Sequence, residues 1–181
     1  MSKKIIVFTS SARKKGNSNA MAEAFITAAE VQGHRVIRID TADLMVKPCL
    51  GCKQCFSKGQ ACVVQDDFNK IAPEVETADG VVFVLPLYWY ALPAALKAVL
   101  DKFYAFYISH RGVGGKECAL IACCEELDAT AMSGVKFAYR KSAELLEWES
   151  VGEVLVPGVD VLGDIKKTDG EAQAAALAKK F

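Results

Sequence analysis

The sequence shows little of what would mark a membrane, secreted or nucleic-acid-binding protein. Its 22 basic and 22 acidic side chains cancel, so no overall field attracts it to nucleic acid. The apolar run near the N-terminus covers only Ile5 to Phe8, which is too short for a signal peptide or a membrane span. Seven cysteines are an odd number, which fits a reducing compartment better than a secreted disulfide framework. We therefore expect a cytoplasmic protein with no membrane span and no nucleic-acid partner.

Nucleotide-binding signatures and a histidine site are also missing. The chain has neither G-x-G-x-x-G nor G-x-x-x-x-G-K-[ST], which argues against a Rossmann dinucleotide site and against a nucleotide triphosphatase. The two histidines, His34 and His110, have no spacing to a partner, so neither is assigned to catalysis. No repeat or low-complexity linker divides the sequence. With 181 residues, 52% of them hydrophobic, the chain can bury one full core, and a single domain over residues 1–181 is expected.

Apolar strands alternate with amphipathic helices along the chain. Strands are predicted at residues 4–9, 34–39, 80–85, 118–123 and 152–156, and helices at 19–32, 66–77, after Pro93, 132–149 and after Thr168. This alternation demands right-handed crossovers and a parallel sheet covered on both faces, which is the doubly wound arrangement. Ligands of such sheets bind beyond the carboxyl ends of the strands. The loops after the first, third and fourth strands are therefore the candidate site.

The loop after the first strand, residues 10–19, reads SSARKKGNSN and leads straight into a helix. Its hydroxyl, amide and backbone N–H groups would converge on the positive end of that helix, which favours binding of a single phosphate. The alternative is an ordinary polar loop in which Ser18 or Asn19 caps the helix.

The loop after the third strand, Pro86 to Tyr90, brings two tyrosines and a tryptophan to the end of a central strand. A flat aromatic ligand could bind there, and backbone N–H groups at such a loop can hydrogen-bond to the ring of a flavin. Aromatic packing under a surface loop or a subunit contact is the alternative.

The fourth-strand loop is acidic, with Glu125, Glu126 and Asp128 in four positions. These acids could border a cofactor ring, but we interpret them as a solvated charge run. The neighbouring cysteines, Cys118, Cys123 and Cys124, are expected to be small buried apolar side chains rather than ligands.

Four further cysteines lie within one short segment, in a C-x2-C-x2-C-x6-C array formed by Cys49, Cys52, Cys55 and Cys62. Thiolates at this spacing can converge on one soft metal centre, and three in a row favour an iron–sulfur cluster. Zinc, a disulfide pair or unused thiols are the alternatives.

Together these segments resemble the flavodoxin-like NAD(P)H-dependent FMN reductases, and within them the iron–sulfur flavoproteins. The likeness rests on four motifs: a strand followed by S-x-R-x-x-x-N-S and a helix, then C-x2-C-x2-C-x6-C-x3-DD, P-L-Y-W and LP-x-x-LK-x-x-x-DK. It is close from Lys4 to Lys102 and looser beyond. The family's usual Gly-Ser-Pro-Arg is here Ser10-Ser11-Ala12-Arg13, which keeps the hydroxyl and the guanidinium.

The resemblance implies a flavodoxin-like three-layer α/β/α sandwich whose five-stranded parallel sheet has the order 2-1-3-4-5, with a cysteine-rich loop at residues 49–62. It implies that the FMN phosphate is held by Ser11, Arg13, Asn17, Ser18 and Asn19. It implies that the isoalloxazine is flanked by Pro86, Leu87, Tyr88 and Trp89. It also implies a [4Fe–4S] cluster on Cys49, Cys52, Cys55 and Cys62.

The expected function is that of an FMN-dependent oxidoreductase, which takes a hydride from NADH or NADPH and passes electrons, with or without the cluster, to a small molecule or a redox protein. FMN suits this role because it accepts two electrons together and can release them singly. No protein acid or base is expected. A flavodoxin-type electron carrier and a metal-binding or regulatory module are the alternatives, although a net charge of zero disfavours the first. The aromatic loop beside an amphipathic helix predicts a homodimer or higher homo-oligomer.

Overall fold

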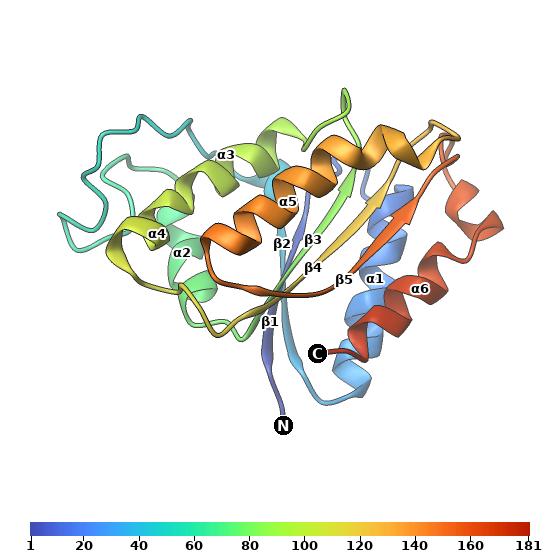
Figure 1. Cartoon of the computed structure of the whole chain (residues 1–181), viewed down its shortest axis with the longest axis horizontal. Helices are drawn as coiled ribbons and strands as arrows, with labels where there is room; N and C mark the ends of the chain where they lie inside the picture. The colour runs from blue at the N-terminus through green and yellow to red at the C-terminus, as the bar shows by residue number, and fades with distance from the viewer.

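The structure, a computed structural model that describes residues 1–181, is built on one five-stranded sheet (Figure 1). All four pairs of neighbouring strands are parallel, and their order is β2-β1-β3-β4-β5, which confirms the predicted topology. The strands are β1 (Lys4–Thr9), β2 (Arg35–Asp40), β3 (Gly80–Pro86), β4 (Glu117–Cys123) and β5 (Glu149–Val156).

Alternate residues of the central strands face opposite sides of the sheet and form two cores. Phe8 of β1 and Phe83 of β3 lie in the first core, where their rings stack with centroids 5.9 Å apart. Val7 and Val82 lie in the second core. Because both faces are covered, β1, β3 and β4 are buried almost throughout, as their continuous apolar sequences predict.

Helices cover both faces and complete three layers (Figure 1). The first face carries α2 (Phe68–Glu76), α3 (Ala94–Lys102), α4 (Tyr104–Ser109) and α5 (Ser133–Leu145), and the second carries α1 (Asn17–Val31) and α6 (Gly170–Ala178). Three 3-10 turns complete the set: η1 (Thr41–Asp43), η2 (Ala129–Met132) and η3 (Asp164–Lys167). None of the helices combines the length and the apolar character needed to span a membrane.

Some predicted boundaries were wrong. α1 begins at Asn17, two residues before the predicted start. The helix predicted over residues 132–149 ends at Leu145, because the chain turns there with a positive φ of 55° at Glu147 and directs Trp148 inward, where its Nε1 donates to Gly112 O at 3.0 Å. β5 consequently begins at Glu149 rather than at residue 152.

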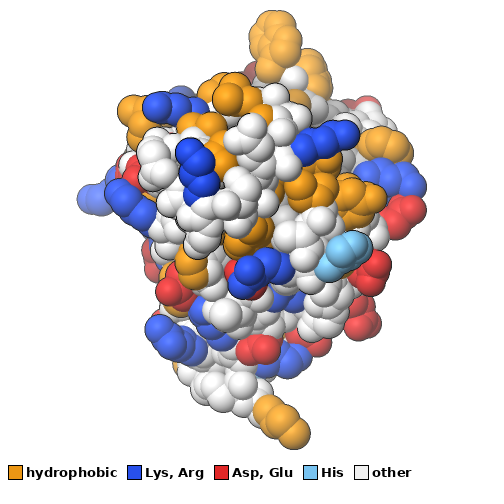
Figure 2. Space-filling model, turned by 90° about the vertical axis from the view of Figure 1, so that its left-hand side faces the viewer, with side chains coloured by type: hydrophobic (Ala, Val, Ile, Leu, Met, Phe, Trp, Pro, Cys, Tyr) orange, Lys and Arg blue, Asp and Glu red, His pale blue; other side chains and the backbone are white.

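The cysteine array lies in a long segment between η1 and α2, residues 44–67, which we call the cysteine loop. It contains no helix or strand and lies at the left of Figure 1, beside α3 and α4. Three of its lysines, Lys47, Lys53 and Lys58, are exposed, and none of them forms an ion pair. Figure 2 views the molecule from this side and shows Lys and Arg side chains spread over the face.

Candidate functional site

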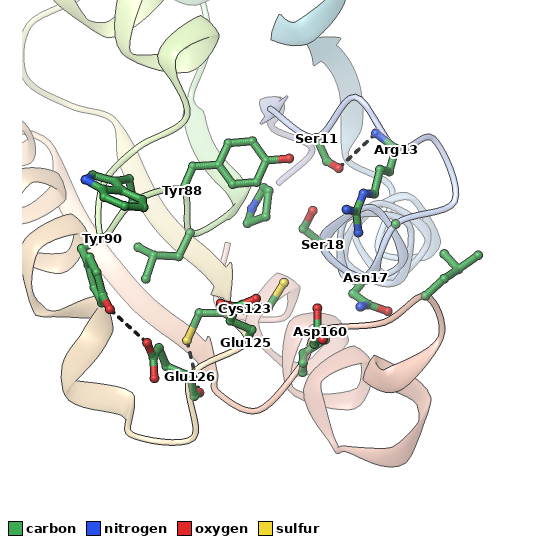
Figure 3. Close-up of a pocket in the computed structure, with 17 residues that line it drawn as sticks. Ser11, Arg13, Asn17, Ser18, Tyr88, Tyr90, Cys123, Glu125, Glu126 and Asp160 are labelled. Atoms are coloured by element: carbon green, nitrogen blue, oxygen red, sulfur yellow. Dashed lines mark hydrogen bonds between the residues drawn. The ribbon is translucent and has the colours of Figure 1, made fainter.

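A pocket of about 540 Å³ lies at the carboxyl edge of the sheet (Figure 3). This volume is typical of sites for cofactors and small molecules. The structure brings the three predicted loops together here and adds a fourth, the loop after β5. The residues that line the pocket are Ser11, Arg13, Gly16, Asn17, Ser18, Pro86, Leu87, Tyr88, Trp89, Tyr90, Cys123, Cys124, Glu125, Glu126, Val159, Asp160 and Leu162.

The loop after β1 is a tight turn that ends at the start of α1. Arg13 N donates to Ser11 Oγ at 3.2 Å, and Gly16 N donates to Arg13 O at 2.7 Å. A Cβ atom at Gly16 would lie 2.9 Å from that same carbonyl oxygen, so only glycine fits the turn without a shift of the backbone. The local sequence therefore fixes where α1 begins.

Several groups around this turn have no partner within the protein. No side chain caps α1, so neither Ser18 nor Asn19 acts as the ordinary helix cap considered above. The Arg13 guanidinium is exposed and forms no ion pair. Ser10 Oγ is the one buried side-chain polar atom without a hydrogen-bond partner. Uncapped N–H groups beside a free guanidinium form an arrangement that fits a phosphate, although Ser10 itself does not line the pocket.

Two of the predicted phosphate ligands already have protein partners. Asn17 Nδ2 donates to Val161 O at 2.9 Å, and its Oδ1 accepts from Gly163 N at 3.0 Å, which ties the loop after β5 to α1. Asn19 donates to Arg13 O at 2.9 Å and does not line the pocket. The side-chain amides of Asn17 and Asn19 thus support the walls of the pocket. Ser11, Arg13 and Ser18 line the pocket on the side that faces Tyr90 (Figure 3).

The loop after β3 is a two-residue hairpin that projects from the sheet edge (Figure 1). Tyr88 N donates to Ala91 O at 3.2 Å and Ala91 N donates to Tyr88 O at 3.0 Å. The two residues at its tip, Trp89 and Tyr90, have positive φ angles of 50° and 61°, as in a type I′ turn, which normally carries Asn-Gly. Bulky residues in this conformation are strained, and such strain is concentrated at functional sites.

The hairpin exposes its aromatic side chains to differing degrees. Trp89 is 94% exposed, whereas Tyr88 is 47% exposed, and the Tyr88 ring points across the pocket toward Ser11 (Figure 3). Tyr90 Oη donates to Glu126 Oε1 at 3.0 Å, and this bond raises the pKa of the tyrosine. The hairpin is thereby fastened to the loop after β4.

Backbone hydrogen bonds join the remaining loops into the floor of the pocket. Leu87 N donates to Cys123 O at 2.8 Å, and Val159 N donates to Cys124 O at 2.8 Å. Cys123 and Cys124 are buried, as predicted, and burial raises the pKa of the Cys123 thiol to about 12. Burial also raises the pKa of the Cys124 thiol, so the floor favours the neutral form of both thiols.

The charge around the pocket is asymmetric. Arg13 and the N-terminus of α1 are positive and lie on one side, and the carboxylates of Glu125 and Glu126 lie toward the other, whereas Asp160 lies near Asn17 (Figure 3). The anionic end of an elongated ligand is therefore favoured on the Arg13 side.

Sequence reasoning missed part of this lining. The acidic run was interpreted as solvated, and Glu125 and Glu126 are indeed exposed, yet both border the pocket. Val159, Asp160 and Leu162 were missed altogether. The signal was available, because the carboxyl end of a fifth parallel strand meets the same edge as the others.

The four cysteines of the array lie away from the pocket, and none of them lines it. All are free thiols, with Cys52 exposed. Burial raises the pKa of Cys55, and the charges of Cys62, Cys49 and Cys52 add to that effect. No three His, Cys, Asp or Glu side chains are arranged to hold a metal ion. The donor set suits a soft metal, but the thiols do not converge on one point.

Comparison with known proteins identifies curated proteins of similar sequence and solved structures of similar fold. An iron–sulfur flavoprotein of Methanocaldococcus jannaschii is 30% identical over 99 residues, which cover 55% of this chain and 51% of that protein. An iron–sulfur flavoprotein of Archaeoglobus fulgidus is also 30% identical over 99 residues, covering 55% of this chain and 44% of that protein. The chain thus spans about half the length of these curated relatives.

Among solved structures, an NAD(P)H:quinone oxidoreductase from Methanothermobacter marburgensis has a TM-score of 0.73 at 16% identity, covering 99% of this chain and 96% of that one. This likeness shows the flavodoxin-like fold. The family model described as NADPH-dependent FMN reductase matches residues 3–134. Because that match covers most of the chain, including the loops after β1, β3 and β4, this protein belongs to the NADPH-dependent FMN reductase family.

Proposed function

We propose that this protein is an FMN-dependent oxidoreductase whose flavin binds in the pocket at the carboxyl edge of the sheet. One observation carries the proposal: an uncapped helix N-terminus with a free Arg13 and a strained aromatic hairpin line the same cavity. The first fits a phosphate and the second fits a flat ring. Membership of the FMN reductase family supports the same cofactor.

The protein's own groups would bind and orient the cofactor. Ser11, Arg13 and Ser18 would hold the phosphate, and the first-turn N–H groups of α1 would add donors. Pro86 to Trp89 would lie along the ring. FMN, when bound, supplies the exchange between two-electron and one-electron chemistry. The buried protonated thiols of Cys123 and Cys124 keep charge away from the floor beneath it.

The electron donor is proposed to be NADH or NADPH. The family description names NADPH, and a relative in fold is described as an NAD(P)H:quinone oxidoreductase. The nicotinamide ring would reach the flavin past the exposed Trp89 at the tip of the hairpin. The acceptor would be a small molecule or a redox protein that reaches the same pocket.

A second proposal concerns the cysteine loop, which would hold a [4Fe–4S] cluster. It is favoured by four free thiols in one loop and by the description of the curated relatives as iron–sulfur flavoproteins. Cys49, Cys52, Cys55 and Cys62 would be the ligands. When bound, such a cluster supplies one-electron transfer.

Rapid mixing of the FMN-loaded protein with NADH or NADPH under anaerobic conditions tests the proposal. Bleaching of the flavin absorbance within seconds is expected with at least one of the two. A flavodoxin-type carrier would bind FMN but show no such bleaching. A metal-binding or regulatory module would fail at the earlier step and show no saturable FMN binding.

A further inference from the structure

The motif residues Asp66, Asp67 and Lys102 have no part in the flavin pocket. Instead, Lys102 Nζ at the end of α3 pairs with Asp66, and both side chains are 1% exposed. Lys102 also lies over the Phe68 ring, 5.7 Å from its centroid. A buried ion pair is costly to desolvate, so its presence requires precise geometry and further hydrogen bonds.

Those further bonds close the base of the cysteine loop. Asp66 Oδ2 accepts from Lys47 N at 2.9 Å and its Oδ1 accepts from Phe68 N at 3.1 Å. Asp67 Oδ2 accepts from Met45 N at 2.8 Å. The two ends of the loop, which lie some twenty residues apart in sequence, are therefore held side by side and anchored to α3.

At the start of α2, Asn69 fixes the backbone of the last cysteine. Its Oδ1 accepts from Cys62 N at 2.8 Å, and its Nδ2 donates to Cys62 O and to Val64 O, each at 3.0 Å. Gln60 Nε2 donates to the same Cys62 carbonyl at 2.9 Å. Both polar backbone groups of Cys62 are therefore satisfied by side chains, and Cys62 packs against the first core.

The other end of the array is held much less firmly. Residues 48–53, which include Cys49 and Cys52, take part in no hydrogen bond of the structure. Two residues there, Gly51 and Lys53, have positive φ angles of 62° and 57°. A segment with exposed, unbonded backbone lies at the low end of local stability.

We propose that Asp66, Asn69 and Lys102 are positioning residues that preset Cys62 as the fixed ligand of a metal site, and that Cys49 and Cys52 close on it, together with Cys55, when metal binds. The inference rests on the proposed role of the cysteine loop. It explains why the four free thiols of one loop do not converge on one point. The exposed Lys47, Lys53 and Lys58 would offset the negative charge of a tetrathiolate site.

Cobalt(II) titration under anaerobic conditions tests the positioning role, because thiolate-to-cobalt absorption reports ligation without any enzyme turnover. Asn69→Ala and the double variant Asp66→Ala/Lys102→Met should each bind Co²⁺ roughly 10- to 100-fold more weakly than the wild type, as loss of supporting hydrogen bonds does at other metal sites. Asp101→Asn, next to Lys102 but on the surface, is the matched control and should bind as the wild type does.

Hydrogen exchange on the same proteins supplies a readout that global destabilisation would not mimic. In the metal-free wild type, residues 48–53 should exchange much faster than Cys62 and Val64, and Co²⁺ should slow them. In Asn69→Ala, exchange at residues 62–64 should rise while the β-strands stay protected.

The outcomes separate the two proposals. If the wild type binds neither Co²⁺ nor iron, the metal function of the loop is refuted. If the wild type binds metal, and Asn69→Ala and Asp66→Ala/Lys102→Met bind it equally well, the positioning role is refuted and the metal site stands. Protection of residues 48–53 equal to that of residues 62–64 in the metal-free wild type would also overturn the inference.

Discussion

The phosphate assignment predicts how binding of two flavins should respond to a change in one loop. FMN and riboflavin share the isoalloxazine ring, but riboflavin has no phosphate. Replacing Arg13 and Ser18 with alanine removes one charged and one neutral donor from the wall of the pocket. If these groups hold the phosphate, the variant should bind FMN much more weakly and riboflavin almost as the wild type does.

The magnitude follows from the two bonds lost. A hydrogen bond from a charged group contributes about 1.5–3 kcal/mol and a neutral one about 0.5–1.5 kcal/mol, so FMN binding should weaken by roughly 2–4 kcal/mol. This corresponds to a dissociation constant raised roughly 30-fold to 1,000-fold. Folding should be little affected by the arginine, which is exposed and forms no ion pair.

Quenching of flavin fluorescence on titration with each protein measures both constants, and Lys15→Ala, an exposed change in the same loop that does not line the pocket, serves as the control. Raising the salt concentration should weaken FMN binding in the wild type more than in the variant, because the charge-assisted bond is screened. Equal losses of FMN and riboflavin affinity would refute the phosphate assignment and indicate damage to the ring site instead. An unchanged FMN affinity would refute it outright.

Three further predictions concern the tip of the aromatic hairpin, the buried Lys102 and the cysteine thiols. Replacing Trp89-Tyr90 with Asn-Gly should raise the melting temperature, by an amount equivalent to about 1–2 kcal/mol, while slowing flavin reduction in the assay above; a lower melting temperature would show that the aromatic tip stabilises the fold. Lys102→Met should lower the free energy of unfolding in urea by about 3–5 kcal/mol, because it leaves a buried carboxylate without its partner; a loss below about 1 kcal/mol would contradict the burial of the pair. In the metal-free protein, iodoacetamide at about pH 8 should alkylate Cys52 well before Cys123, because a thiol whose pKa is about 12 is only about one ten-thousandth thiolate at that pH; mass spectrometry of the peptides would reveal the reverse order if Cys123 were reactive.

The strand pattern of the sequence predicted the sheet because burial on both faces demands continuous apolar runs. Residues 80–85 are such a run, and the structure places them in the central strand β3. Helix ends were predicted less well, since they depend on contacts between distant segments. The helix ends before Trp148 because the indole of this residue hydrogen-bonds to Gly112, which is distant in sequence. No pattern in the neighbouring sequence predicts that contact.

The pocket walls were predicted by topology, and their internal supports were not. That loops at the carboxyl edge would meet follows from parallel strand direction alone. That Asn17, which lines the pocket, would also bond to Val161 and Gly163 depends on where the loop after β5 runs. A motif thus identifies which residues are near a site, but the division between groups that contact the ligand and groups that hold the wall is decided by tertiary packing.

The hairpin tip shows where a local rule and the structure conflict, and why the conflict is informative. A two-residue turn between β3 and α3 with positive φ at both central positions would be satisfied most easily by Asn-Gly, yet the chain has Trp89-Tyr90 there. The Tyr90 bond to Glu126 is exposed and offsets only part of the strain. Burial does not compensate either, because Trp89 is 94% exposed. Natural sequences violate local preferences mainly at functional sites, so we predict that the compensating interaction comes from a ligand or partner that contacts the exposed ring.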